Sequence, residues 1–338
     1  MRFSPIVIAS ALTLLTACPP PGSSGGGPSG GTNPSGQHRR GALAPPSCGA
    51  IDVNPVGRKI HAFLLASYEL DKASFELEES VYAACRDMAI ALDVPVVGDT
   101  ATLCNAVSLE LDANLEVSVS QEQRLVTRTA PPVCTTTVDF AAEVAATCEA
   151  RAEVDIDARC DGYCTGTCAG VCEGQCATVN ANGSCAGACN GQCRGRCTGQ
   201  CRGSVSVDAD AECKAAAEIR ADVRTECTEA KVVVVTENVT VVDSTKFDKA
   251  TRAIEIGMPN ILRAGAKATI VAKSLVHWAK TAGELAVSGG KVIAAVGERS
   301  VCVGLELAAA VAASTHISAR INVSIEVSAK LSASAGTN

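Results

Sequence analysis

Cysteine is the residue type in this chain whose number and spacing point most clearly to chemistry. The 338 residues contain 19 cysteines, and ten of them form two runs with a step of four residues and the pattern Cys-x-Gly-x. The runs are Cys160, Cys164, Cys168, Cys172, Cys176 and Cys185, Cys189, Cys193, Cys197, Cys201. Cysteines at this density form either disulfides or a thiolate metal site.

Two further pairs of cysteines indicate how the runs pair. Cys148 and Cys213 lie 12 residues outside the runs, and Cys134 and Cys227 lie 14 residues further out. Every pair related by this mirror has residue numbers that sum to 361, as an antiparallel hairpin requires. The predicted bridges are Cys176–Cys185, Cys172–Cys189, Cys168–Cys193, Cys164–Cys197, Cys160–Cys201, Cys148–Cys213 and Cys134–Cys227.

Strand geometry supports this pairing. A step of four keeps every cysteine on one face of a strand, whereas cysteines neighbouring along one strand lie about 13 Å apart, too far for a bridge. Directly opposed residues have Cα atoms about 4.5–5.5 Å apart, within the disulfide range. Glycine at every fourth position opposes a helix. We therefore expect a hairpin with its tip near residues 177–184, with Gly162 opposite Gly199 and Gly170 opposite Gly191.

The rival interpretation of the cysteine runs is a metal site. Zinc sites favour Cys-x2-Cys spacing and often use histidine, and neither feature occurs in the runs. The four histidines, His38, His61, His277 and His316, lie outside metal and nucleophile motifs. No phosphate loop, redox Cys-x-x-Cys or nucleophile elbow is present. We therefore expect no catalytic residue, no metal and no cofactor, and a protein that is not an enzyme.

The first residues are typical of an export signal. Arg2 precedes an apolar run too short to span a bilayer, and the run ends in Leu15-Thr16-Ala17-Cys18. This tetrapeptide resembles the lipobox of bacterial lipoproteins, in which the cysteine is acylated and becomes the mature N-terminus. The resemblance implies a signal peptide over 1–17 and lipidation of Cys18. The following residue, Pro19, implies by the same resemblance an outer-membrane lipoprotein facing the periplasm or the cell surface.

With the Cys-x-Gly-x runs added, the chain resembles uncharacterised cysteine-rich envelope lipoproteins of myxobacteria. The resemblance covers residues 1–47 and 134–227 and implies location and architecture. Residues 18–47 are rich in Pro, Gly and Ser and are predicted to form a flexible tether. The net charge of −7 carries no basic footprint for nucleic acid. Val301 to Ile317, the least polar later stretch, contains Glu306, so we expect membrane attachment through the lipid alone.

The remaining segments predict an α+β fold. Helical spacing covers residues 56–92, and about three helices are expected over 247–313, with breaks near Met258-Pro259 and Ser288-Gly290. Alternating apolar residues predict strands over 107–119, 232–242 and 317–333. Four cysteines lie in these segments and allow three connectivities, of which we favour Cys85–Cys104 and Cys48–Cys302.

The base of the hairpin also alternates, in residues 150–158 and 204–211. Mirror pairing would place Val154 on Val207 and Ile156 on Val205. Residues 134–148 and 213–227 are compatible with either strand or helix.

The predicted architecture has N- and C-terminal helices packed with amphipathic antiparallel strands, and a long projecting β-hairpin cross-linked by a disulfide ladder. The segments are 48–130, a helical segment plus a strand; 131–230, the laddered hairpin; and 231–338, a strand, a helical segment and a C-terminal amphipathic strand. We expect a membrane-anchored structural or interaction protein with an envelope or surface protein partner. A pore-forming or toxic effector and a metal-binding protein are the alternatives.

Overall fold

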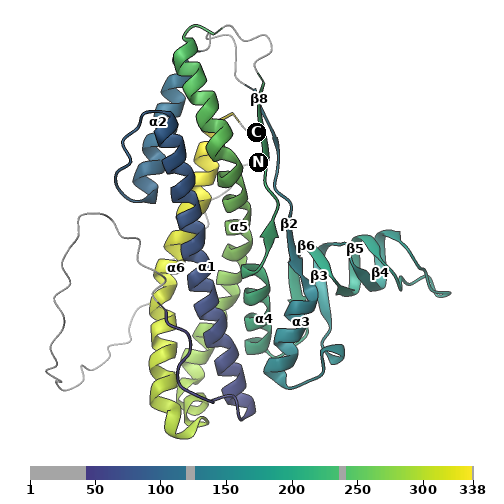
Figure 1. The fold of residues 1–338 in the computed structure, drawn as a ribbon. Helices are drawn as coiled ribbons and strands as arrows, with labels where there is room; N and C mark the ends of the chain where they lie inside the picture. Colours follow the sequence, from purple (N-terminus) through teal and green to yellow (C-terminus); the bar gives the residue numbers. More distant parts are fainter. Residues whose placement is uncertain (1–42, 119–125, 236–240, 337–338) are drawn as a thin grey trace, which may run out of the picture. The chain divides into compact units, whose positions relative to one another are not determined.

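The computed structural model describes residues 43–118, 126–235 and 241–336 and has the expected α+β class (Figure 1). Its helices are α1 (Pro55–Ala91), α2 (Thr100–Ser118), α3 (Val138–Glu149), α4 (Ala211–Val223), α5 (Ser244–Ala294) and α6 (Ser300–Ser334). Its strands are β1 (Val126–Ala130), β2 (Cys134–Thr137), β3 (Ala158–Cys164), β4 (Thr167–Cys176), β5 (Cys189–Thr198), β6 (Gln200–Val207), β7 (Glu226–Cys227) and β8 (Lys231–Val235). Cys18 and the rest of the predicted signal and tether, up to residue 42, lie outside the described residues.

Helix α1 forms where helical spacing predicts it. Asn54 caps its N-terminus by accepting a hydrogen bond from the Gly57 amide at 2.7 Å, and Pro55 occupies the first turn, where its missing N–H costs nothing. Helices α1, α5 and α6 pack against one another, and α2 and α4 pack against α1 and α5. Buried Phe63 and Trp278 stack across α1 and α5 with ring centroids 6.0 Å apart. This helical bundle has an ordinary apolar core.

The expected breaks in the segment 247–313 are wrong. Helix α5 runs for 51 residues and passes through Pro259. Met258 and Ile261 on either side of this proline are fully buried in a cluster with α1 and α2. Tertiary packing outweighs the local cost of the proline, which removes one helical hydrogen bond. The turn instead lies at residues 295–299, which include a short 3-10 helix, Gly297–Arg299.

Two predicted strands, 107–119 and 317–333, are also wrong. Residues 107–118 lie in helix α2, and residues 317–333 lie in helix α6. Their apolar residues satisfy both periods. Leu103, Val107 and Leu111 repeat at four and are fully buried, whereas Leu109, which alternation would place beside them, is 59% exposed. The helical period therefore decides which residues face the core.

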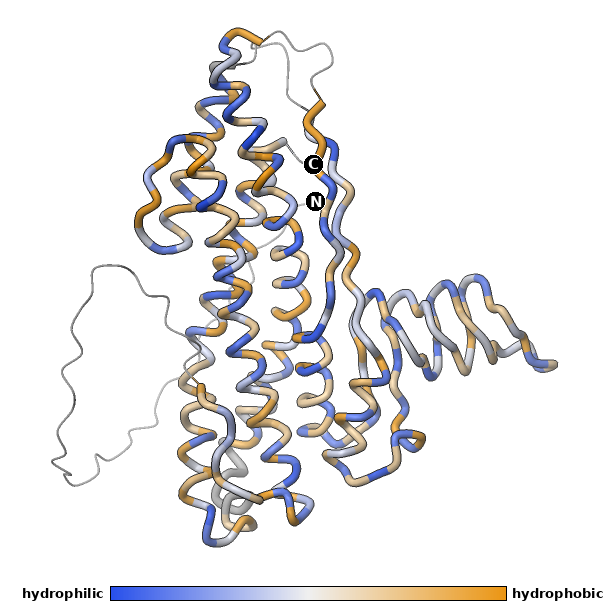
Figure 2. The backbone as a smooth tube through the Cα atoms, viewed as in Figure 1, coloured by the Kyte–Doolittle hydropathy of each residue, from blue (hydrophilic) through white to orange (hydrophobic). Residues whose placement is uncertain are grey.

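Helix α6 differs from expectation in a second way. The segment Gly297–Ser334 is long and apolar enough to cross a membrane by length and composition, despite Glu306. Core helices of soluble proteins can be equally long and apolar, but most of their residues are buried. Only 22% of the most apolar window is buried here, and Val301 and Leu305 are among the exposed residues. Figure 2 shows the hydropathy along the chain.

The strands form two antiparallel sheets. In the smaller one β1 pairs with β8, which confirms the β prediction for residues 232–235; residues 236–240 of that prediction lie outside the described part. The larger sheet has the order β4-β5-β3-β6-β2-β7. Helices α3 and α4 pack on each other and on its base, with Arg224 stacked 4.0 Å above the Phe140 ring.

The segments that flank the cysteine runs contain both a strand and a helix, the two structures that the sequence allows. Residues 134–148 form β2 and then α3, and 213–227 form α4 and then β7. The predicted strand over 150–158 is wrong up to Asp157, because α3 ends at Ala150 in the left-handed region and a 3-10 helix covers Glu153–Asp155. Val154 is 72% exposed and does not pair with Val207, whose partner is Ala158. Likewise Val205 pairs with Cys160 and not with Ile156.

Candidate functional site

The described part of the chain contains nine disulfides. Seven are the mirror pairs Cys134–Cys227, Cys148–Cys213, Cys160–Cys201, Cys164–Cys197, Cys168–Cys193, Cys172–Cys189 and Cys176–Cys185. The other two are Cys48–Cys302 and Cys85–Cys104, the connectivity that we favour from sequence. The hairpin is therefore cross-linked by the predicted pairs.

The strand register beneath these bridges is not the predicted one. Paired Cα positions in β4–β5 and β3–β6 have residue numbers that sum to 365, as in Cys168 with Cys197, whereas the bridged numbers sum to 361. A cysteine is thus bridged to a residue four positions from its direct cross-strand neighbour. The expectation that the bridges join directly opposed residues is wrong for the five bridges of the two runs, and it holds for Cys134–Cys227, whose residues are direct cross-strand partners.

A second set of contacts explains the offset. Tyr163 and Cys164 of β3 also pair with Gln192 and Gly191 of β5, and Gly170 exchanges backbone hydrogen bonds with Cys185. These pairs sum to 355. Strands β3 and β4 therefore have the returning arm of the hairpin on both sides, offset by ten residues, so the ribbon winds into a coil in which neighbouring turns are hydrogen-bonded (Figure 1).

The bridges cross the interior of this coil. A residue of the outgoing arm has one neighbour on each side, and the two pairs have residue numbers that sum to 365 and 355. The residue midway between these two neighbours along the returning arm lies on the opposite wall of the coil, and its pair would have a sum of about 360. The bridged cysteines have residue numbers that sum to 361, so each disulfide reaches within one residue of this position on the opposite wall. In the five bridges of the two runs the Cα atoms are 5.6–6.3 Å apart. The interior is therefore narrow and filled with sulfur.

Burial agrees with this geometry. Eight of the ten cysteines in the runs are at most 3% exposed, and Cys172 and Cys176 near the tip are half-buried. They share a cluster with the alanines and valines of α3, α4 and β6. Sulfur thus extends the apolar core of the base into a segment with few aliphatic side chains. We call residues 158–207 the disulfide coil.

Glycine pairs allow the walls of the coil to approach closely. Gly170 lies opposite Gly195, and Gly174 opposite Gly191, which corrects the predicted glycine pairs. A Cβ atom built on Gly170 would lie 2.3 Å from the Arg194 carbonyl oxygen. Gly195 also has a φ of +143°, a conformation that side chains disfavour. The glycines of these facing pairs are required by this contact.

The outer surface of the coil is polar with a few large side chains. Tyr163, 47% exposed, lies opposite Arg202, and Val171, 55% exposed, lies opposite Arg194. Arg194 forms an ion pair with Glu173 at 2.7 Å. Directly opposed residues share one face of a sheet. Each pair therefore places an apolar or aromatic side chain beside a cation on the outside.

The tip is short and hydrogen-bonded. The Asn180 backbone N–H donates to the Ser184 backbone carbonyl at 2.7 Å, and the Ser184 hydroxyl donates to Asn182 Oδ1 at 2.6 Å. Gly183 has a φ of +83°, a conformation that glycine adopts without steric cost. Val179 is 60% exposed at this end.

The described cysteines leave no thiolate for a metal. Cys48, Cys302 and Glu306 form the one group of potential ligands found in the described part of the chain, but both sulfurs are bonded to each other. Cys18 lies outside that part.

A pair of buried carboxyl groups, which sequence reasoning missed, joins α4 to α5. Asp222 accepts a hydrogen bond from the Ser274 hydroxyl at 2.6 Å, and burial raises its pKa to about 7. Glu218 lies 2.9 Å from His277 Nδ1, and burial raises its pKa as well, against the effect of Lys214 and His277. Both acids lie in residues 213–227, for which the sequence leaves strand and helix open, so the buried face of this segment is not defined by the sequence. His277 is thus placed beside an acid.

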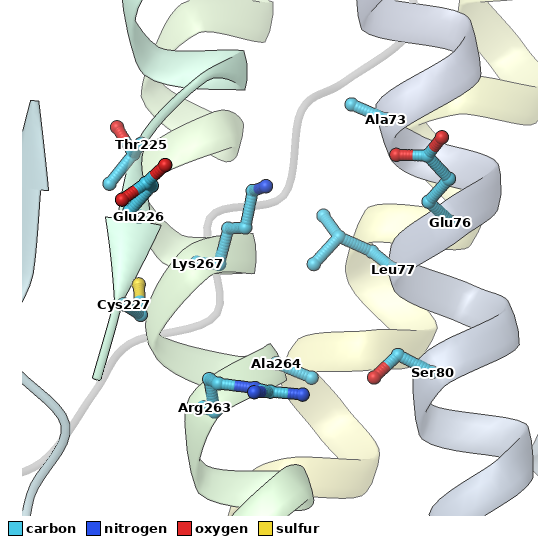
Figure 3. A pocket seen from close by; sticks show the side chains of 10 residues that line it. All are labelled: Ala73, Glu76, Leu77, Ser80, Thr225, Glu226, Cys227, Arg263, Ala264 and Lys267. Carbon is cyan, nitrogen blue, oxygen red and sulfur yellow. The ribbon is translucent and has the colours of Figure 1, made fainter. Parts of the chain in front are cut away.

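A hollow of about 400 Å³ lies between α1, β7 and α5 at the base of the coil (Figure 3). Its lining includes Cys227 of the outermost bridge, Glu76 and Glu226, and two cations of α5, Arg263 and Lys267. Burial lowers the pKa of Lys267, against the attraction of Glu76 and Glu226. No sequence motif marks these residues.

The fold and bridges define a class of protein: an α+β protein, cysteine-rich and disulfide-bonded, of a non-cytoplasmic compartment, secreted or exposed in the cell envelope. No protein-family model, no curated protein and no solved structure matches the chain.

Proposed function

We propose that this protein is an outer-membrane lipoprotein that is not an enzyme and acts as a structural or interaction element. In this proposal Cys18 carries the lipid, the segment up to residue 42 is the tether, and the disulfide coil meets a protein, cell-surface or matrix partner. Residues 43–47 of the predicted tether are instead held on the bundle, because the backbone amides of Leu43 and Ser47 donate to Asp71 and Glu306. The observation that carries the proposal is the construction of the coil, with sulfur inside and exposed Tyr–Arg and Val–Arg pairs outside.

The physical argument concerns rigidity. A segment of 50 residues with so few aliphatic side chains cannot be held by hydrophobic burial, and a two-stranded ribbon is marginal alone. Here two sets of backbone ladders and five bridges constrain it. Pre-organised surfaces lose little entropy on binding, and Tyr and Arg are enriched among residues that dominate binding energy. A recognition surface is therefore a suitable role for the coil.

The test compares two exposed cross-strand pairs. Tyr163→Ser with Arg202→Ser alters the outer face of the coil, and Arg128→Ser with Val233→Ser alters an exposed pair in the β1–β8 sheet as a matched control. Binding of the oxidised protein to washed outer-membrane fragments and to intact cells is measured. We expect about tenfold weaker binding for the coil variant alone. Equal binding by both variants and the wild type would contradict the role of the coil.

The anchor is tested separately. Mass spectrometry of the N-terminal peptide from the membrane fraction is expected to show an acylated Cys18, and Cys18→Ser is expected to release the folded protein from membranes. An unmodified N-terminus, or membrane attachment unchanged in Cys18→Ser, would contradict the lipoprotein assignment. This outcome would leave the binding test of the coil intact.

A second candidate function, membrane insertion as a pore-forming or toxic effector, is favoured by α6. Its exposed Val301 and Leu305 lie near Cys302, which the bridge to Cys48 ties to the start of the fold. If α6 inserts, dye release from liposomes should rise when Cys48–Cys302 is removed by serine substitution and fall in Leu305→Glu. Absence of release from both the wild type and the bridge variant would exclude this candidate.

A further inference from the structure

The hollow at the base of the coil contains two cations without an ion pair. Arg263 and Lys267 are one helical turn apart on α5, and both project into the space between β7 and α1 (Figure 3). Neither forms an ion pair or a side-chain hydrogen bond within the described ranges. Like charges at this spacing repel each other, and the charge of Arg263 accordingly lowers the pKa of Lys267.

Other cations near the bundle core form ion pairs with carboxylates. Arg220 donates two hydrogen bonds of 3.0 Å to Glu69, and Arg320 lies 2.9 Å from Asp71 and 3.6 Å from Glu78. In the hollow, Glu76 and Glu226 lie on opposite walls and do not reach the cations. The two cations therefore keep their donors directed at the cavity.

An oxyanion placed between these cations would relieve their repulsion and accept hydrogen bonds from both. Arg binds carboxylates in a bidentate manner, and Lys adds a point charge. The two carboxylates on the walls oppose a second negative charge in the same space and favour an ammonium group. The volume of about 400 Å³ lies within the range of small-molecule sites.

We infer that this hollow is a binding site for a small zwitterion, such as a short peptide, with its carboxylate on Arg263 and Lys267 and its ammonium toward Glu76 or Glu226. This inference is independent of the proposed function, because it requires neither the lipid nor the surface of the coil. The rest of the lining consists of Ser80, Thr225, Cys227 and three apolar residues, Ala73, Leu77 and Ala264.

Four probes of nearly equal size separate the two charges. Alanyl-alanine carries both, N-acetyl-alanyl-alanine only the carboxylate, alanyl-alaninamide only the ammonium, and the doubly capped dipeptide neither. Binding to the full oxidised chain is measured by calorimetry or by ligand-observed NMR. We expect the zwitterion to bind most tightly, the carboxylate probe next, and the doubly capped probe not at all.

Variants assign the binding to the hollow. Arg263→Gln and Lys267→Gln should each weaken binding of the zwitterion by about tenfold or more, the loss typical of one charged hydrogen bond. Lys280→Gln, at an exposed position of the same helix, should leave binding unchanged. Glu226→Gln should reduce the preference for the zwitterion over its acetylated form. This variant also keeps the test informative if Arg263→Gln fails to fold.

A direct readout follows from Lys267. Because burial without a bound anion lowers its pKa, binding of alanyl-alanine should raise the pKa of Lys267, as followed by NMR of its 13Cε signal. No binding of any probe, or binding unaffected by both cation variants, would overturn the inference. Equal binding of acetate or inorganic phosphate would reassign the hollow to simple anions and overturn the zwitterion assignment.

Discussion

The disulfide coil and the helical bundle are stabilised by different means. The bundle buries Phe63, Leu70, Trp278 and Ile317 in an apolar core, and two bridges, Cys48–Cys302 and Cys85–Cys104, join its parts. The coil buries sulfur and has glycine where its walls touch. Hydrophobic burial holds a bundle whether or not its cysteines are oxidised, whereas covalent bonds hold the coil only in an oxidising compartment.

Complete reduction should give the largest difference between the regions. Without its bridges the coil loses the cross-links that replace a core, and residues 158–207 should exchange their amide hydrogens rapidly. The helical circular dichroism signal should persist, because α1, α5 and α6 retain their core. Hydrogen exchange with and without reductant measures both regions. Loss of helix at the same reductant concentration as loss of the coil would mean that the two regions fold as one unit.

Removal of a buried side chain from the bundle should destabilise the bundle and leave the coil intact, the reverse of the effect of reduction. Trp278→Ala deletes a fully buried side chain whose indole nitrogen donates to Ser67 Oγ at 2.7 Å, and a cost of about 3–5 kcal/mol is expected. The urea midpoint followed by helical circular dichroism should fall. Under non-reducing conditions, protease resistance of the coil should remain. If the coil becomes protease-sensitive, the bundle supports it.

The junction between the regions should be sensitive to pH. The pKa of Asp222 is about 7 in the folded protein, above the ordinary aspartate value of 3.8, so between these pH values the unfolded chain ionises first. The free energy of unfolding should therefore fall as pH rises, by up to about 4 kcal/mol, and should level off above pH 7. The neighbours Glu218, Lys273 and Ser274 modulate this effect.

Asp222→Asn tests this pH dependence. The variant should be more stable than the wild type at pH 8 and similar to it at low pH, as measured by thermal unfolding across the pH range. Asp208→Asn, at an exposed position, is the matched control and should change little. A pH profile that is the same in Asp222→Asn and the wild type would show that other groups dominate it.

Glycine to alanine substitutions should have opposite signs in the two regions. Gly170→Ala places a Cβ atom against the opposite backbone and should cost about 2–3 kcal/mol. At Gly283, an exposed position of α5, a Cβ atom would meet nothing within 4 Å, and alanine should stabilise the helix by up to about 1 kcal/mol. Thermal unfolding of both variants measures the difference. A neutral Gly170→Ala would imply that the coil walls are further apart than the structure has them.

The cysteine pairs, the fold class and α1 were predictable from sequence. The mirror of the flanking cysteines defines the pairs because an antiparallel return imposes a constant sum, whatever the path of the chain between them. Helical spacing and the cap at Asn54 similarly specify α1 locally. Such signals depend on neighbours in sequence or on symmetry, and both are visible in the chain alone.

Only the tertiary structure decided the register of the ribbon, its coiling, and the choice of helix over strand in α2 and α6. The pairs are compatible with directly opposed or offset strands, and the contact between successive turns that selects the offset joins residues such as Gly170 and Cys185. Apolar residues in α2 and α6 fit both periods until the partner surface is known. Arg263 and Lys267 line a hollow only because α1 and β7 pack beside α5. These features depend on packing between distant segments, which a single sequence does not display.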